Sequence, residues 1–122
     1  MSQRQRATSF RHAFNGIAIV IRTQPNAWIH LAATISVVIA GWLLDVSRHE
    51  WLALIFAIGL VWTAEALNTG LEFLADEISL ERRERLDYAK DVGAAGVLLA
   101  SVASAVIGLL IFMPHLLSLA ER

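Results

Sequence analysis

Three long apolar runs constrain the fold of this chain more than any other feature. They cover residues 27–44, 51–75 and 92–113, and a helix of roughly 20 apolar residues is long enough to cross the hydrocarbon core of a bilayer. Hydrophobic residues make up 57% of the chain, above the roughly 45–50% of soluble domains. We therefore predict an all-α membrane protein with three transmembrane helices, formed by a single domain over residues 1–122.

The N-terminal segment predicts a different kind of helix. Apolar side chains recur at helical spacing within residues 8–23, but the apolar stretch is too short and too interrupted to span a bilayer. We expect an amphipathic helix on the membrane surface, capped by Thr8 or Ser9, with residues 1–7 frayed. Pro25 should separate it from the first transmembrane helix, and Pro114 should end the third.

Charge patterning predicts how the chain is oriented. Residues 76–91 form a charged connector, for which a solvated linker is the simplest interpretation. Of the ten Lys and Arg residues, four precede the first run and four lie in this connector. The positive-inside rule then places the N-terminus and the connector in the cytoplasm. The formal net charge of -1 argues against a nucleic-acid partner, and the absence of cysteine excludes disulfides and thiolate chemistry.

A polar stripe on the second apolar run points to function. Steps of three, four and seven residues return to one helix face, so Glu65, Asn68 or Thr69, Glu72 and Asp76 share a single side. A carboxylate near the centre of a bilayer costs about 2.5–3.5 kcal/mol on insertion scales. An interhelical hydrogen bond in a membrane returns only about 0.6 kcal/mol on average. A catalytic or binding role therefore explains the two glutamates better than helix packing alone.

The residue types fit phosphoryl transfer. Such a reaction needs oxygen ligands for a divalent cation, a positive group for the phosphates and a base for the attacking hydroxyl. Glu72 can supply the carboxylate for Mg²⁺, Lys90 the positive charge and Glu65 the base, with Asn68 orienting either glutamate. The chain has neither a P-loop nor a protein-kinase catalytic motif.

These residues resemble the signature of the prokaryotic diacylglycerol kinase and undecaprenol kinase family. The matching motifs are Glu65-x-x-Asn68-x-x-x-Glu72-x-x-x-Asp76 and Ala89-Lys90-Asp91. Segments 9–16 and 26–31 match as well. The resemblance implies a homotrimeric kinase of the bacterial inner membrane that uses MgATP to phosphorylate a lipid hydroxyl, on diacylglycerol or undecaprenol, at the cytoplasmic interface.

The resemblance also implies roles for individual residues. Glu65 and Asn68 match catalytic positions, Glu72 and Gln24 match metal-binding positions, and Glu65, His30 and Ala94 match the lipid site. The nucleotide-binding positions correspond to His12, Glu72, Glu81, Arg82, Arg83, Lys90 and Asp91.

Two positions distinguish this chain within the resemblance. Where the family often has a second metal-binding glutamate, this chain has Gln24, whose amide coordinates Mg²⁺ without charge, so metal binding should be weaker. The His30 form of the first-run motif resembles the undecaprenol kinase branch, which does not by itself decide the substrate.

Two other classes remain open from the residues alone. A small proton-coupled transporter would use Glu65, but would not explain the polar groups gathered at one end of the second and third runs. A structural subunit of a larger complex would explain Gly96, Ala100, Ser104 and Gly108, a ladder of small residues that lets another helix approach closely, but no carboxylate.

Overall fold

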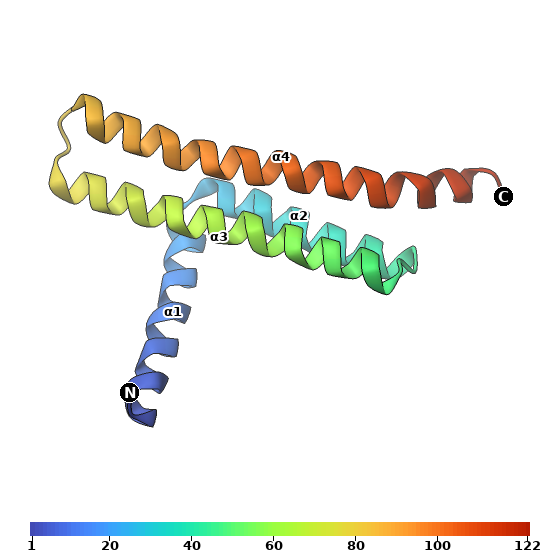
Figure 1. Ribbon diagram of the computed structural model, residues 1–122, viewed down its shortest axis with the longest axis horizontal. Helices are drawn as coiled ribbons and strands as arrows, with labels where there is room; N and C mark the ends of the chain where they lie inside the picture. Colours follow the sequence, from blue (N-terminus) through green and yellow to red (C-terminus); the bar gives the residue numbers. More distant parts are fainter.

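The computed structural model describes residues 1–122 as four helices. These are α1 (Gln3–Thr23), α2 (Pro25–Leu43), α3 (Arg48–Ile78) and α4 (Glu84–Ala120). Figure 1 shows α2, α3 and α4 side by side in a bundle, with α1 projecting away from its flank. The three bundle helices are long and apolar enough to cross a membrane. The prediction of an all-α protein is therefore confirmed, and the three long apolar helices fit the predicted membrane spans.

The bundle turns most of its apolar side chains outward. Only 13 of the 122 residues are buried, although more than half of the chain is hydrophobic. Exposing so much apolar surface to water is unfavourable, whereas exposing it to lipid chains is not, so this distribution fits a protein surrounded by a bilayer. A small core of Val46, Leu54 and Ile111 closes one end of the bundle. Along α4, Ala100 is buried and Ser104 Oγ donates to the carbonyl of Ala57 at 3.0 Å, so part of the small-residue ladder packs against α3 within the chain.

The first helix begins earlier than its apolar pattern predicts. Ser2, not Thr8 or Ser9, is the N-cap, and it forms a capping box with Gln5. The Ser2 hydroxyl accepts from the Gln5 backbone N–H at 3.2 Å, and the Gln5 side chain accepts from the Ser2 N–H at 2.8 Å. These two bonds satisfy backbone groups that a helix start otherwise leaves free, which is why the polar residues before Thr8 are helical.

A compact turn joins α2 to α3. Asp45 adopts a positive φ of 52°, a conformation that Asp tolerates better than most residues. The backbone N–H of Val46 donates to the Gly41 carbonyl at 3.1 Å, and that of Asp45 donates to the Trp42 carbonyl at 3.2 Å. This pair of bonds is a Schellman motif, and it places Val46 in the core beside Leu54. Ser47 then caps α3 in a capping box with Glu50.

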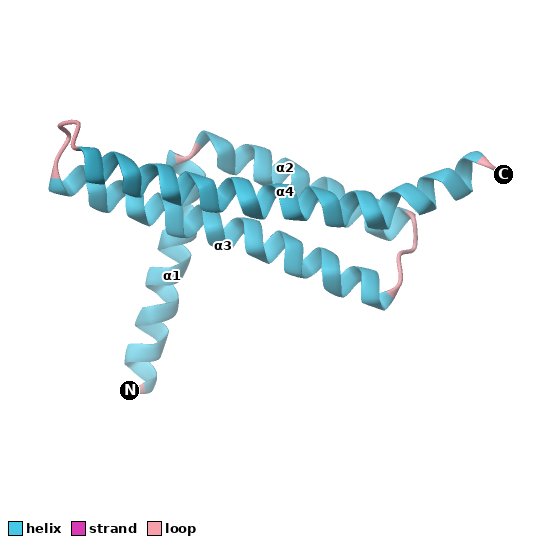
Figure 2. Ribbon diagram, turned by 45° about the horizontal axis from the view of Figure 1, so that its top comes forward, coloured by secondary structure: helices cyan, strands magenta, loops and turns pink.

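Two predictions about α4 and the segment before it were wrong. The charged connector is not a linker over residues 76–91, because only residues 79–83 lie between α3 and α4. The third helix also does not end at Pro114, since α4 continues through it to Ala120. Proline removes one helical hydrogen bond but does not forbid helix on either side. The last turns depart from the line of the helix in Figure 2, as a proline kink produces.

Contacts with the start of α3 hold the last turns of α4 in place. His115 Nε2 lies 3.2 Å from each carboxylate oxygen of Glu50. The backbone N–H of Ser47, and next the His115 side chain, lower the pKa of Glu50 below its ordinary value of 4.5. Glu50 precedes the apolar part of α3, so its charge lies outside the predicted span.

This pair predicts a pH-dependent contribution to stability. A carboxyl group whose pKa is lowered on folding stabilises the fold above its unfolded pKa, and this stabilisation is lost as pH falls through the folded value. We expect Glu50→Gln to melt at a lower temperature than the wild type at pH 7, with the difference shrinking below pH 4.5. Thermal unfolding in detergent at several pH values measures this, with the exposed Glu121→Gln as control. A constant difference between pH 7 and the acid range would contradict it.

Candidate active site

A polar pocket of about 300 Å³ lies where α2 begins, between α2, α3 and α4. The break between α1 and α2 supplies one wall, and the face of α3 that carries the predicted polar stripe supplies another. The residues that line the pocket include Gln24, His30, Glu65, Asn68, Glu72, Ala94 and Ser101. The structure thus brings together six of the residues that the sequence singled out: two glutamates, two amides, one imidazole and one alanine.

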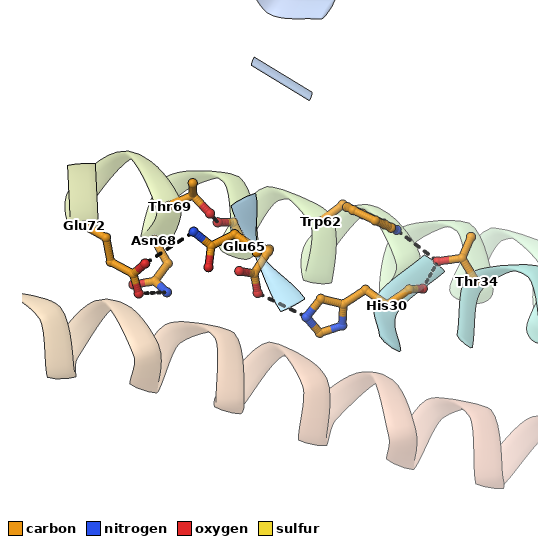
Figure 3. A network of polar contacts seen from close by, with 8 residues as sticks. His30, Thr34, Trp62, Glu65, Asn68, Thr69 and Glu72 are labelled. Carbon is orange, nitrogen blue, oxygen red and sulfur yellow. Dashed lines mark hydrogen bonds and ion pairs between the residues drawn. The ribbon is translucent and has the colours of Figure 1, made fainter. Parts of the chain in front are cut away.

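Glu65 is the most deeply buried polar residue, with 1% of its surface exposed. Its Oε2 lies 3.1 Å from His30 Nε2, the contact drawn in Figure 3. The hydroxyl of Thr69 donates to the Glu65 backbone carbonyl at 2.7 Å, one turn along α3. The other carboxylate oxygen, Oε1, makes no hydrogen bond to another residue. A buried carboxylate with one oxygen held and one free is suited to accept a proton.

Glu72 receives two amide donors. Asn68 Nδ2 donates to Oε1 at 3.3 Å, and Gln24 Nε2 donates to Oε2 at 3.4 Å. Asn68 Oδ1 is buried without a partner, and a Cβ added at Gly93 on α4 would overlap it. The missing side chain of Gly93 therefore gives the amide its room.

The donor atoms of this cluster fit a divalent cation that is completed by a substrate. No group of three or more His, Cys, Asp or Glu side chains gathers as a self-sufficient metal site. Mg²⁺, however, is usually bound through one or two carboxylates together with substrate phosphates. Glu72 provides the carboxylate, and the amide oxygens of Gln24 and Asn68 are further oxygen ligands of the kind that Mg²⁺ accepts.

Lys90 faces α3 just outside the pocket. Its Nζ lies 2.6 Å from Asp76 Oδ1, and this contact crosses from α4 to α3 close to the loop. The hydrogen bond to Asp76 raises the pKa of Lys90 above its ordinary value of 10.5, and the charges of Asp76, Asp87 and Glu72 add to it. Lys90 precedes the apolar part of α4 and remains fully charged at neutral pH.

The structure does not bring the other predicted nucleotide residues into the pocket. All of them are exposed, and none lines it: His12 on α1, Glu81, Arg82 and Arg83 at the loop, and Asp91 on α4. Arg82 Nε lies 3.7 Å from Asp87 Oδ2 with its side chain 95% exposed, a surface pair worth little. Glu81, Arg82 and Arg83 lie at the loop end of the bundle, whereas His12 lies on α1, which projects away from it.

An apolar groove of about 600 Å³ adjoins the polar pocket. It runs between α2, α3 and α4 and is lined mainly by small and aliphatic side chains, among them Ala33, Val37 and Val61. His30 and Ser101 line both spaces, so they stand at the junction between polar and apolar surroundings.

Two residues at the site escaped the analysis of the sequence. Ser101 lies seven residues after Ala94 and so returns to the same face of α4, and Thr34 lies one turn after His30 on α2. Both are small polar residues in apolar runs, where a packing role is the simplest interpretation. The one signal in the sequence that could have identified them is their helical spacing, four residues after His30 for Thr34 and seven after Ala94 for Ser101.

The fold and the site define a small helical membrane protein in which a buried carboxylate lines a polar pocket and contacts a histidine that lines both this pocket and an apolar groove. This is the arrangement of an enzyme that acts on a lipid. The profile of the prokaryotic diacylglycerol kinase family matches residues 11–112, and the chain belongs to this family.

Individual relatives agree with this assignment. The chain is 40% identical over 108 residues to the undecaprenol kinase of Bacillus subtilis, covering 88% of each chain. It is 36% identical over 112 residues to a diacylglycerol kinase of Synechocystis, covering 91% of this chain and 64% of that one. It is 35% identical over 97 residues to the diacylglycerol kinase of Escherichia coli, covering 73% and 79%. The protein is therefore a membrane lipid kinase, and the transporter alternative is not favoured.

Proposed function

We propose that this protein transfers the γ-phosphoryl group of ATP to the hydroxyl of a membrane lipid alcohol, undecaprenol or diacylglycerol. The observation that carries the proposal is the position of Glu65, which lines the polar pocket with one oxygen free and contacts His30, a residue that lines both the pocket and the apolar groove. A lipid chain can lie in the groove while its hydroxyl reaches the carboxylate. The product is undecaprenyl phosphate or phosphatidic acid.

Glu65 acts as the general base in this proposal. Its free Oε1 accepts the proton of the lipid hydroxyl, and the alcohol oxygen forms a bond to the γ-phosphorus. The bond between that phosphorus and the oxygen bridging to the β-phosphate breaks, and ADP leaves with the electron pair. Burial of the carboxylate excludes water, which would otherwise compete as the attacking hydroxyl. Asn68 keeps Glu72 oriented one turn away.

Glu72, Gln24 and Asn68 would hold Mg²⁺ together with the nucleotide phosphates. When bound, the cation supplies the positive charge that neutralises the phosphate oxygens. Glu72 contributes the one full negative charge among the three side chains. The protein thus supplies less negative charge to the cation than two carboxylates would. The affinity of the site for Mg²⁺ therefore depends more on the phosphates of ATP.

Lys90 is the cation that this proposal assigns to the nucleotide phosphates. Asp76 holds it at the polar end of the pocket, and a phosphate that binds there shares or replaces this partner. Asp91, Glu81, Arg82 and Arg83 are exposed at the start of α4 and in the loop before it, where they are available to the outer parts of a nucleotide. His12 is exposed on α1 and would meet a nucleotide only from that helix. His30 and Ala94 line the pocket on the lipid side.

We also propose that the protein works as a homotrimer in the bacterial inner membrane, with its N-terminus in the cytoplasm. The family resemblance implies the trimer, and the extensive apolar surface of the bundle leaves room for neighbours. The charge distribution supports the orientation. In α1, Phe10, Phe14 and Ile17 are exposed and so available to insert into the membrane surface.

Replacing the base tests the reaction directly. We expect Glu65→Gln to lose at least about 10²-fold in turnover, because the amide has no basic oxygen for the proton. The assay follows labelled γ-phosphate from MgATP into diacylglycerol and undecaprenol, offered side by side in mixed micelles. The labelled lipid identifies the acceptor. Glu77→Gln, an exposed change later in α3, is the matched control.

Two results would contradict this account. If Glu65→Gln retained turnover, Glu65 would not be the general base. A folded wild-type protein that labels neither lipid would overturn the proposed reaction.

Restoring a carboxylate at residue 24 tests the metal assignment. Gln24 Nε2 already lies 3.4 Å from Glu72 Oε2, so Gln24→Glu places two negative charges together that a cation would relieve. We expect half-maximal activity at about tenfold lower Mg²⁺ concentration and a larger thermal stabilisation by MgATP than in the wild type. Gln3→Glu on exposed α1 is the control. An unchanged Mg²⁺ dependence would place residue 24 outside the metal site.

A further inference from the structure

A closed chain of contacts lies beside the polar pocket, on the side of the apolar groove. The hydroxyl of Thr34 donates to the His30 backbone carbonyl at 2.7 Å and accepts from Trp62 Nε1 at 2.9 Å. The ring of Trp62 in turn meets the ring of His30 edge to face, with centroids 6.0 Å apart and an interplanar angle of 68°. Figure 3 shows these side chains together with Glu65.

Helical spacing makes this chain of contacts possible. His30 and Thr34 are one turn apart on α2, while Trp62 and Glu65 are three residues apart on α3, so each pair lies on one face of its helix. Thr34 reaches Trp62, and His30 reaches Glu65. The two helices are therefore joined twice: by the Thr34–Trp62 hydrogen bond, which together with the Trp62–His30 ring contact we call the brace, and by the contact between His30 and Glu65.

The brace removes a freedom that His30 would otherwise have. Rotation of an imidazole about its last side-chain torsion is broad, and the same is true of a glutamate carboxylate. His30 lines the wide apolar groove as well as the pocket, so the surrounding packing alone does not hold its ring. Trp62 covers one side of the ring, and the bond to Thr34 holds the indole in place. A buried indole N–H needs a partner in apolar surroundings, and Thr34 provides it.

We propose that Thr34 and Trp62 are positioning residues for phosphoryl transfer. They fix the His30 ring so that Nε2 stays on Glu65 Oε2, which leaves Glu65 Oε1 turned to the pocket. To donate to the carboxylate, the ring carries its proton on Nε2. The inference rests on the proposed role of Glu65 as base. It adds two residues that act through His30 and not on the reacting atoms, although Thr34 also lines the apolar groove.

Removing the Thr34 hydroxyl at constant shape is the principal test. We expect Thr34→Val to lower kcat about tenfold with the KM for MgATP unchanged, because a displaced base slows proton transfer without altering nucleotide binding. Thr34→Ser keeps the hydroxyl and should restore most of kcat. Ser36→Ala is the matched control. The Ser36 hydroxyl donates to the Ala32 carbonyl at 2.7 Å, as Thr34 does to His30, but Ser36 is exposed.

A double-mutant cycle separates positioning from helix packing. If Thr34 acts through His30, Thr34→Val should cause little further loss of kcat in a His30→Ala background. Trp62→Phe, which keeps a ring but removes the N–H donor, should behave like Thr34→Val. Nitrogen NMR of labelled histidine should show Nε2 of His30 protonated in the wild type and a changed signal in Thr34→Val.

Three outcomes would overturn the inference. One is a Thr34→Val kcat equal to that of Ser36→Ala. Another is a loss that is fully additive with His30→Ala. The third is a loss that follows the melting temperature and is not restored by Thr34→Ser, which would assign Thr34 to helix packing alone. A wild-type protein without phosphoryl transfer would instead overturn the proposed function, so the two failures are distinguishable.

Discussion

The contact between Glu65 and His30 is the interaction on which the rest of the site depends. A carboxylate at this depth is costly in a bilayer unless it has a polar partner, and the imidazole on α2 is that partner at 3.1 Å. The contact requires α2 to approach α3 at the level of Glu65, although α3 packs mainly against α4. The break at Gln24 starts α2 at the height where both Glu72 and Glu65 are within its reach. Two carboxylates on α3 are thus matched by two polar residues at the start of α2, the cap residue Gln24 and His30.

The short loop after α3 organises the other side of the pocket. Because only residues 79–83 separate α3 from α4, the two helices run alongside each other from the start, as Figure 1 shows. Lys90 therefore meets Asp76 across the gap, and Gly93 comes against the Asn68 amide one turn further along. The amide has room only because that position of α4 lacks a side chain. The polar cluster is thus assembled by helix packing and needs no loop of its own.

Local periodicity explains what could be predicted from the sequence. The stripe of Glu65, Asn68 and Glu72 follows from helical spacing within one element, and so do the three apolar helices. Features that depend on contacts between elements were missed. Pro114 lies inside a helix whose last turns His115 ties to Glu50. Residues 84–91 are helical because they pack back along α3. Thr34 and Ser101 could not be predicted as site residues, because only the position of the facing helices shows that they lie beside the pocket.

The apolar groove beside the pocket bears on the route by which the product of the proposed reaction would leave the site. A lipid alcohol is nearly neutral and can rest with its chain in the groove and its hydroxyl beside His30. Its phosphorylated product carries negative charge, and moving such a group back past Val61 or Ala33 would strip it of water without any cation to receive it. The product therefore has one favourable exit, toward the membrane surface where its headgroup is hydrated. The same groove that admits the lipid alcohol would thus be unfavourable for the phosphorylated headgroup, so substrate and product would use different sides of the site.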